Sequence, residues 1–127
     1  MIDELVAHAR AEAPNECCGM IASSGGEAVR VYPVTNAEAS SLRFVMDERE
    51  QYLAMQEIDD DGKEVGAIYH SHTRSEPRPS ETDILHARTW WPDPLWVIVG
   101  LTSEQPEIRA WSINRQGEVS EVPLDVV

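Results

Sequence analysis

An apolar run that ends in two closely spaced histidines constrains this chain more than any other feature. Residues 65–69 read Val-Gly-Ala-Ile-Tyr, which is typical of a buried β-strand, and His70-Ser71-His72 follows directly. Side chains along a strand alternate between its two faces, so His70 and His72 project side by side on the same face. Ser80 and Asp83 come next, where the sequence predicts the start of a helix. The stretch therefore predicts a strand, a loop and a helix that share polar groups.

Two interpretations of these polar groups are open from the residues alone. Ser80 can be the N-cap of the helix with Asp83 returning a hydrogen bond to it, which is a purely structural arrangement. An isolated His-x-His pair also occurs on surfaces and in protein cores. Two neutral imidazoles and one carboxylate are, however, a usual ligand set for a catalytic zinc ion with one open position. The joint spacing, with Glu16 upstream at the start of another candidate strand, favours a metal site.

The same residues resemble the signature of the JAMM (MPN-plus) metalloprotease family, in which a distant glutamate precedes His-x-His, seven residues and then Ser-x-x-Asp. The matching residues, in chain order, are Glu16, His70, His72, Ser80 and Asp83. Asn36 lies in a Val-Thr-Asn-Ala stretch at 34–37 that is typical of the prokaryotic members. Residues 69–73, Tyr-His-Ser-His-Thr, are most similar to a small actinobacterial type that releases cysteine from a sulfur-carrier protein. Many relatives carry proline at the position of Thr73.

The resemblance implies a fold and a ligand set. The fold is the MPN fold, an α/β architecture related to cytidine deaminases, with a curved central mixed sheet and helices packed on it. The cofactor is Zn²⁺, held by His70, His72 and Asp83. A bound zinc ion lowers the pKa of its water to about 7. Glu16 would take the proton from that water and return it to the leaving amine, and Ser80 would donate a hydrogen bond to the oxyanion.

The substrate implied by the resemblance is a ubiquitin-like sulfur-carrier protein with a C-terminal Gly-Gly. The expected reaction is hydrolysis of the amide bond after that Gly-Gly, with release of cysteine for cysteine biosynthesis. Three alternatives stay open. The first is a broader isopeptidase that removes ubiquitin-like modifiers from lysines. The second is a non-catalytic carrier-binding module, in which stoichiometric zinc is not expected, and the third is a small-peptide metallopeptidase.

Length and charge limit the remaining classes of function. With 127 residues, the chain is expected to form one domain over 1–127 with a core of its own. No apolar span of membrane length and no signal-peptide pattern is present, so we expect a soluble cytoplasmic protein without a membrane partner. The net charge of −13, from 23 acidic and 10 basic residues, disfavours phosphate binding and hence a nucleic-acid partner. Nothing in the sequence indicates an oligomeric state.

The two cysteines, Cys17 and Cys18, are adjacent. Neighbouring side chains on a strand point in opposite directions, so a disulfide between them is geometrically disfavoured. We interpret both as small buried hydrophobes in a protein of a reducing compartment, with a redox-sensitive thiol beside Glu16 as the functional alternative.

Apolar spacing and turn residues predict helices and strands in alternation. The helices are expected at 2–13, 47–59 and 80–88, and the strands at 17–22, 28–33, 43–46, 65–72, 95–101, 107–113 and 118–123. On the second helix, Tyr52, Met55 and Ile58 are expected to be core residues. Strands interleaved with helices indicate a layered α/β domain.

Overall fold

The computed structural model describes residues 1–124. Within them the helices are α1 (Ile2–Glu12), α2 (Glu48–Asp60) and α3 (Glu81–Trp90). The strands are β1 (Cys18–Ser24), β2 (Glu27–Val34), β3 (Glu64–His72), β4 (Leu95–Gly100), β5 (Glu107–Ile113) and β6 (Val119–Val122). These are all the predicted elements except the strand at 43–46, with ends close to those expected. None of the helices in residues 1–124 is both long enough and apolar enough to span a bilayer.

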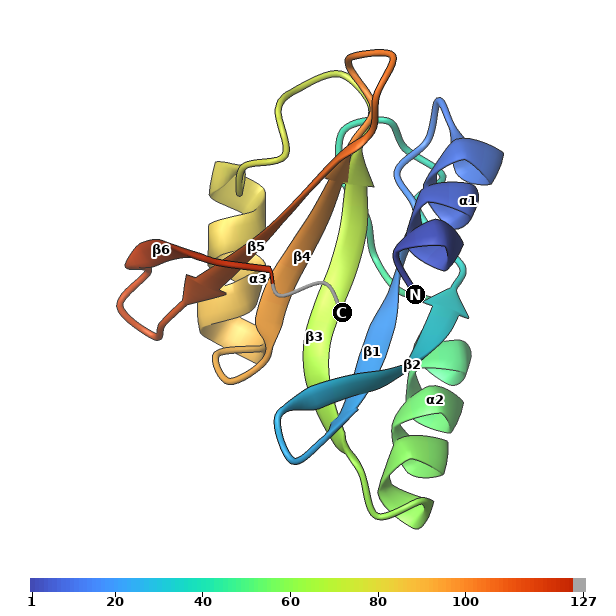
Figure 1. Ribbon diagram of the computed structural model, residues 1–127, viewed down its shortest axis with the longest axis vertical. Helices are drawn as coiled ribbons and strands as arrows, with labels where there is room; N and C mark the ends of the chain where they lie inside the picture. The colour runs from blue at the N-terminus through green and yellow to red at the C-terminus, as the bar shows by residue number, and fades with distance from the viewer. Residues whose placement is uncertain (125–127) are drawn as a thin grey trace.

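The strands form one mixed sheet in the order β2-β1-β3-β4-β5-β6 (Figure 1). The central pair, β3 and β4, is parallel, and every other neighbouring pair is antiparallel. A parallel pair requires a crossover connection, which α3 provides. The carboxyl end of β3 and the start of α3 are therefore joined by one short segment, residues 73–80, which we call the 73–80 loop.

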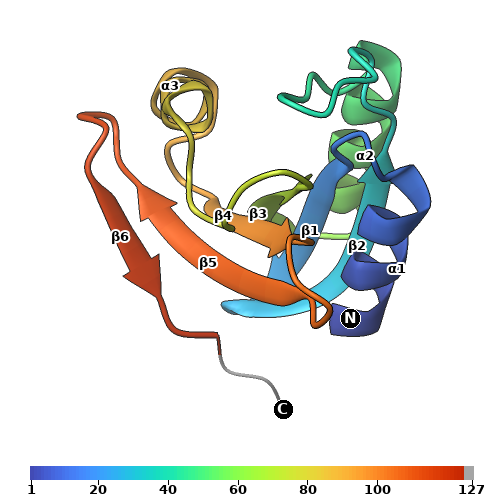
Figure 2. The ribbon, with the colours of Figure 1, turned by 90° about the horizontal axis from the view of Figure 1, so that it is seen from above.

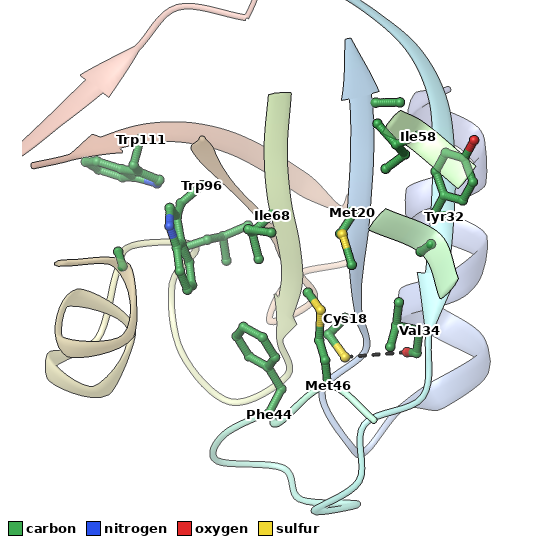
Figure 3. Close-up of a cluster of buried hydrophobic side chains, with 14 of the residues drawn as sticks. Cys18, Met20, Tyr32, Val34, Phe44, Met46, Ile58, Ile68, Trp96 and Trp111 are labelled. Atoms are coloured by element: carbon green, nitrogen blue, oxygen red, sulfur yellow. Dashed lines mark hydrogen bonds between the residues drawn. The ribbon is translucent and has the colours of Figure 1, made fainter. Parts of the chain in front are cut away.

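The helices cover both faces of the sheet, which is visibly curved (Figure 2). Leu5 and Ala9 of α1 pack against side chains on one face of the sheet. On the other face, α2 and α3 cover a larger cluster with several aromatic rings (Figure 3), whose buried members include Met20, Phe44, Ile58, Ile68, Trp96 and Trp111. A mixed sheet between helices confirms the predicted α/β class.

Two predictions about the segment before β3 are wrong. Tyr52 and Met55 are exposed, at 64% and 38%, because α2 buries only a narrow stripe made by Ala54 and Ile58. The strand expected at 43–46 is reduced to a single bridge between Asn36 and Met46. The side chain of Asn36 makes the hydrogen bonds that a partner strand would make, because it contacts the backbone of residues 38, 43 and 45.

The adjacent cysteines behave as buried hydrophobes. Cys17 packs in the cluster under α1 and Cys18 in the cluster under α2 and α3, so the two side chains lie on opposite faces of the sheet. Both thiols are free, and burial raises the pKa of Cys17 to about 11. The thiol of Cys17 is therefore protonated and unreactive at neutral pH. The thiol of Cys18 donates to the carbonyl oxygen of Val34 at 3.4 Å (Figure 3).

Candidate active site

The polar residues singled out in the sequence gather at the carboxyl end of β3. His70 and His72 lie at the end of β3, and Asp83 lies in the first turn of α3. All three are buried, with exposed fractions of 0%, 4% and 4%. The 73–80 loop turns the chain from β3 back over the sheet, and this brings the carboxylate from the helix to the two imidazoles from the strand.

The three potential ligand atoms form a nearly regular triangle. The Nε2 atoms of His70 and His72 are 3.1 Å apart, and the Oδ2 atom of Asp83 lies 3.0 Å from the first and 3.1 Å from the second. In tetrahedral zinc sites with bonds of 2.0–2.1 Å, neighbouring ligand atoms are about 3.3 Å apart. The donor types and their spacing therefore fit a zinc ion, and no other group of three such side chains in residues 1–124 comes together in this way.

Asp83 serves two arrangements through one oxygen atom. Its Oδ2 accepts a hydrogen bond from the backbone N–H of Ser80 at 2.9 Å, and the Ser80 hydroxyl accepts one from the N–H of Asp83 at 3.1 Å. This capping box starts α3, and the same Oδ2 faces the two imidazoles. Burial alone would raise the pKa of Asp83, but the imidazoles of His70 and His72 and the Ser80 N–H hold it well below its usual range. Asp83 is therefore a carboxylate at neutral pH.

The two histidines have different surroundings. The ring of His70 is enclosed by aromatic rings: Phe44 lies 4.7 Å away between centroids and Trp96 lies 5.5 Å away. Burial lowers the pKa of His70, which favours a neutral imidazole. The Nδ1 atom of His72 donates instead to the backbone carbonyl of Glu76 at 2.8 Å. With its proton on Nδ1, a neutral His72 keeps the Nε2 lone pair free for a metal ion.

Glu16 reaches the same place from the segment just before β1. The antiparallel register of β1 and β3 pairs Cys18 with His70, and extending this register by two residues places Glu16 opposite His72. Residues directly opposite on antiparallel strands point to the same face. Glu16 is 4% exposed, and its Oε1 atom has no hydrogen-bond partner among the described residues. Burial raises the pKa of Glu16 to about 8, against a lowering by the neighbouring His72.

The backbone around Glu16 is held from several sides. Its N–H donates to the carbonyl of Ser40 at 2.8 Å, and its carbonyl accepts from the side chain of Asn36 at 3.0 Å. The next N–H, that of Cys17, donates to the hydroxyl of Ser71 at 2.8 Å. Thr73 donates to the carbonyl of Pro14 at 2.9 Å. The strand that carries the histidines therefore also fixes the segment that carries Glu16.

An unpartnered, buried carboxylate oxygen beside three converging donor atoms requires an explanation. A divalent cation supplies one, because it would balance the charges of Glu16 and Asp83 and would accept the lone pairs of both imidazoles. Ser80 is also at the site, because its backbone N–H donates to the carboxylate of Asp83. Ser80 is an exposed residue. Since its hydroxyl oxygen only accepts in the capping box, the hydroxyl hydrogen remains able to donate.

Several residues at the site had no assigned role in the sequence. Asn36 stands out in the sequence only as part of a stretch that resembles the family. Ser71 lies between the two histidines, but its side chain points to the other face of the strand. Phe44 reaches His70 from the irregular segment before α2. The carbonyl of Glu76 is a backbone group, which no side-chain pattern can indicate. The alternation of side chains along β3 is the one sequence signal for the role of Ser71, because it places Ser71 on the face of the sheet that α1 covers.

Comparisons with known proteins agree with this geometry. Residues 1–114 match the family model described as prokaryotic homologs of the JAB domain. The chain is 36% identical to the CysO-cysteine peptidase of Mycobacterium tuberculosis over 100% of this chain and 87% of that protein. It is 31% identical to the desampylase of Pyrococcus furiosus over 87% of this chain and 76% of that protein.

Solved structures show the same architecture. A solution structure of a Desulfitobacterium hafniense protein superimposes with a TM-score of 0.79 at 32% identity, over 95% of this chain and 84% of that one. A JAB1/MPN domain protein from Archaeoglobus fulgidus gives a TM-score of 0.64 at 22% identity, over 99% of this chain and 91% of that one. The expected MPN fold and the resemblance to JAMM proteins are confirmed: the chain belongs to the family of prokaryotic homologs of the JAB domain and is a hydrolase of the peptidase type.

Proposed function

We propose that this protein is a zinc-dependent hydrolase that cleaves the amide bond after the C-terminal Gly-Gly of a ubiquitin-like sulfur-carrier protein and releases cysteine. The observation that carries the proposal is the convergence of His70, His72 and Asp83, within 3.1 Å of one another, beside the unpartnered carboxylate of Glu16. The ligand triangle would hold Zn²⁺. When bound, zinc polarises a carbonyl group and lowers the pKa of water toward 7.

Glu16 is the proposed general base. It takes a proton from the attacking water, whose oxygen forms a bond to the carbonyl carbon of the second glycine. When the C–N bond breaks, Glu16 returns the proton to the leaving amine. Positioned acid–base groups of this kind contribute roughly 10²–10⁴-fold in rate. The contacts of Asn36, Ser40 and Ser71 with the backbone at 16–17 hold Glu16 in place for both transfers.

Ser80 is the proposed donor to the oxyanion. Its oxygen accepts from the N–H of Asp83, which fixes the side-chain rotamer and leaves its own O–H free to donate. One such donor is worth about 2.7–4 kcal/mol in other oxyanion holes. Ser80 is not proposed as a nucleophile, because the neighbouring imidazoles of His70 and His72 are turned toward the metal position.

The substrate class is supported by the comparisons. The relative from Mycobacterium tuberculosis is named a CysO-cysteine peptidase, and the match covers this whole chain. A relative from Thermus thermophilus is named a probable TtuB-protein conjugate cleaving protease. We propose a carrier of this kind, ending in Gly-Gly, as the partner. With both cysteines free, we also propose the cytoplasm as the compartment and residues 1–127 as a single domain.

A second candidate is an isopeptidase that removes ubiquitin-like modifiers from lysine side chains. It is favoured by the relative from Pyrococcus furiosus, which is named a desampylase. The two candidates share the carrier and the bond after Gly-Gly, and they differ only in the leaving amine. A carrier–cysteine adduct and a carrier–lysine conjugate therefore separate them in one assay.

The test is incubation of each adduct with the zinc-loaded protein, followed by intact-mass measurement of the carrier. We expect loss of the cysteine residue from the carrier, no loss after treatment with a chelator, and no loss with Glu16→Gln. Faster cleavage of the lysine conjugate would favour the isopeptidase. Equal cleavage of short peptides without any carrier would contradict both candidates and indicate a small-peptide metallopeptidase.

A further inference from the structure

The 73–80 loop is held more firmly than an irregular segment needs to be. Pro77, in its middle, is fully buried although the residues on both sides of it are exposed. Its ring packs on Gly100 at the end of β4, where an added Cβ atom would lie 2.8 Å from the Cδ atom of Pro77. The close approach of loop and sheet therefore requires glycine at this position.

Trp111 of β5 supplies a second anchor. Its indole Nε1 donates to the carbonyl oxygen of Pro77 at 2.9 Å. Trp111 is 4% exposed, so water cannot replace this partner if it is lost. The guanidinium groups of Arg109 and Arg78 lie 4.8 and 5.8 Å from the centre of the indole ring. Figure 3 shows Trp111 beside Trp96 of the neighbouring strand.

The carbonyl group of Pro77, which Trp111 holds, is next in the chain to the carbonyl group that orients His72, a proposed metal ligand. Pro77 O accepts from Trp111, and Glu76 O, one residue earlier, accepts from Nδ1 of His72 at 2.8 Å. The peptide between Glu76 and Pro77 carries no N–H, because proline has none. Its orientation therefore depends on the buried proline ring and on two hydrogen bonds to Glu76 O, one from Nδ1 of His72 and one from the backbone N–H of Arg78 at 2.8 Å. That N–H belongs to the same peptide group as Pro77 O, which Trp111 holds.

We propose that Trp111 is a positioning residue for the metal centre, acting through Pro77 and Glu76 on His72. By holding Pro77 O, it keeps Glu76 O directed at Nδ1 of His72. That hydrogen bond selects the tautomer with the proton on Nδ1 and presents the Nε2 lone pair to the metal. The proposal rests on the zinc site described above and adds to it a residue on a different strand, which is not itself a proposed ligand.

The test is Trp111→Phe, which keeps an aromatic ring and removes only the N–H and part of the volume. Loss of a group that orients a metal-bound histidine typically weakens metal binding 10–100-fold; because Glu76 O itself remains, we expect a zinc dissociation constant raised roughly tenfold. Trp91→Phe is the matched control, since Trp91 is a partly buried indole at the opposite end of α3 from Asp83. Its zinc affinity should equal that of the wild type.

A second readout needs no metal. In the metal-free wild type, NMR should show a slowly exchanging Nδ1 proton of His72, protected by its bond to Glu76 O. We expect this resonance to be lost or broadened in Trp111→Phe and retained in Trp91→Phe. Gly100→Ala displaces Pro77 without changing Trp111, so it should produce the same two effects and serves if Trp111→Phe does not fold.

Unchanged zinc affinity together with an unchanged His72 resonance in a folded Trp111→Phe or Gly100→Ala variant would overturn the proposal. A failure of the proposed function would be seen in the wild-type protein instead of in the variants. If the wild-type protein binds no zinc, the metal site is wrong, and the His72 resonance alone then decides whether Trp111 orders the bond to Glu76.

Discussion

Replacing Glu16 by glutamine should make the metal-free protein less sensitive to alkaline pH, although the same change removes the proposed base. Glu16 is buried, and burial raises its pKa from the ordinary 4.5 to about 8. An acid whose pKa is higher in the folded than in the unfolded state binds more protons when folded. Its contribution to stability is therefore fully present below the unfolded pKa of 4.5 and is lost as the pH rises to about 8.

The size of the effect follows from the two pKa values. At about 1.36 kcal/mol per pKa unit, the difference between 4.5 and about 8 is worth up to about 5 kcal/mol. Water that enters the site will stabilise the carboxylate, so we expect about 2–4 kcal/mol between about pH 5 and about pH 9. Glutamine does not titrate. The cost of burying its amide, about 1–3 kcal/mol, shifts the whole curve without changing its slope.

The assay is urea unfolding of chelator-treated protein across this pH range. The stability of Glu16→Gln relative to the wild type should rise with pH by the amount given above. Glu12→Gln removes the same charge from an exposed position at the end of α1 and should follow the wild-type curve. Parallel curves for the wild type and Glu16→Gln would refute the reasoning, because they would show that the Glu16 carboxylate is solvated in the folded protein.

Three further substitutions test the site and its support. His70→Ala should abolish stoichiometric zinc, measured by elemental analysis, whereas His86→Ala should retain it; zinc retained by both would exclude His70 as a ligand. Ser80→Ala should keep zinc, lower kcat on the carrier adduct roughly 10²-fold through loss of the oxyanion donor, and lower the unfolding free energy by about 1 kcal/mol through loss of the N-cap; an unchanged kcat would count against the oxyanion role. Gly19→Ala should destabilise the protein by about 1–3 kcal/mol in urea unfolding, because its Cβ would overlap the buried ring of Tyr69 and the backbone carbonyl of Tyr32; wild-type stability would contradict this packing.

The convergence of His70, His72 and Asp83 follows from local rules of sequence. Alternation along β3 places His70 and His72 on one face, and the Ser80-x-x-Asp83 spacing starts α3. The structural and metal interpretations of Asp83 do not exclude each other, because its Oδ2 receives the Ser80 N–H and also faces both imidazoles. The position of Glu16 is different, since it depends on which strands are neighbours, and only the family resemblance indicated it.

Features that depend on contacts distant in sequence were not predictable. Tyr52 and Met55 have the spacing of core residues, but the small Ala54 lets α2 approach the sheet on another stripe. The segment before α2 has strand-like residues, and Asn36 satisfies its backbone with side-chain bonds instead. The bond from Trp111 to the 73–80 loop joins residues 34 apart in the sequence and ends on a backbone carbonyl. No periodic pattern encodes such a contact.

A crystal structure of the zinc-loaded protein, with anomalous scattering recorded at the zinc absorption edge, tests the central claim most directly. The account predicts one anomalous peak about 2.0–2.2 Å from Nε2 of His70, Nε2 of His72 and a carboxylate oxygen of Asp83, with the carboxylate of Glu16 facing its open side. A peak elsewhere in the molecule, or no peak in protein that has been saturated with zinc, would contradict it.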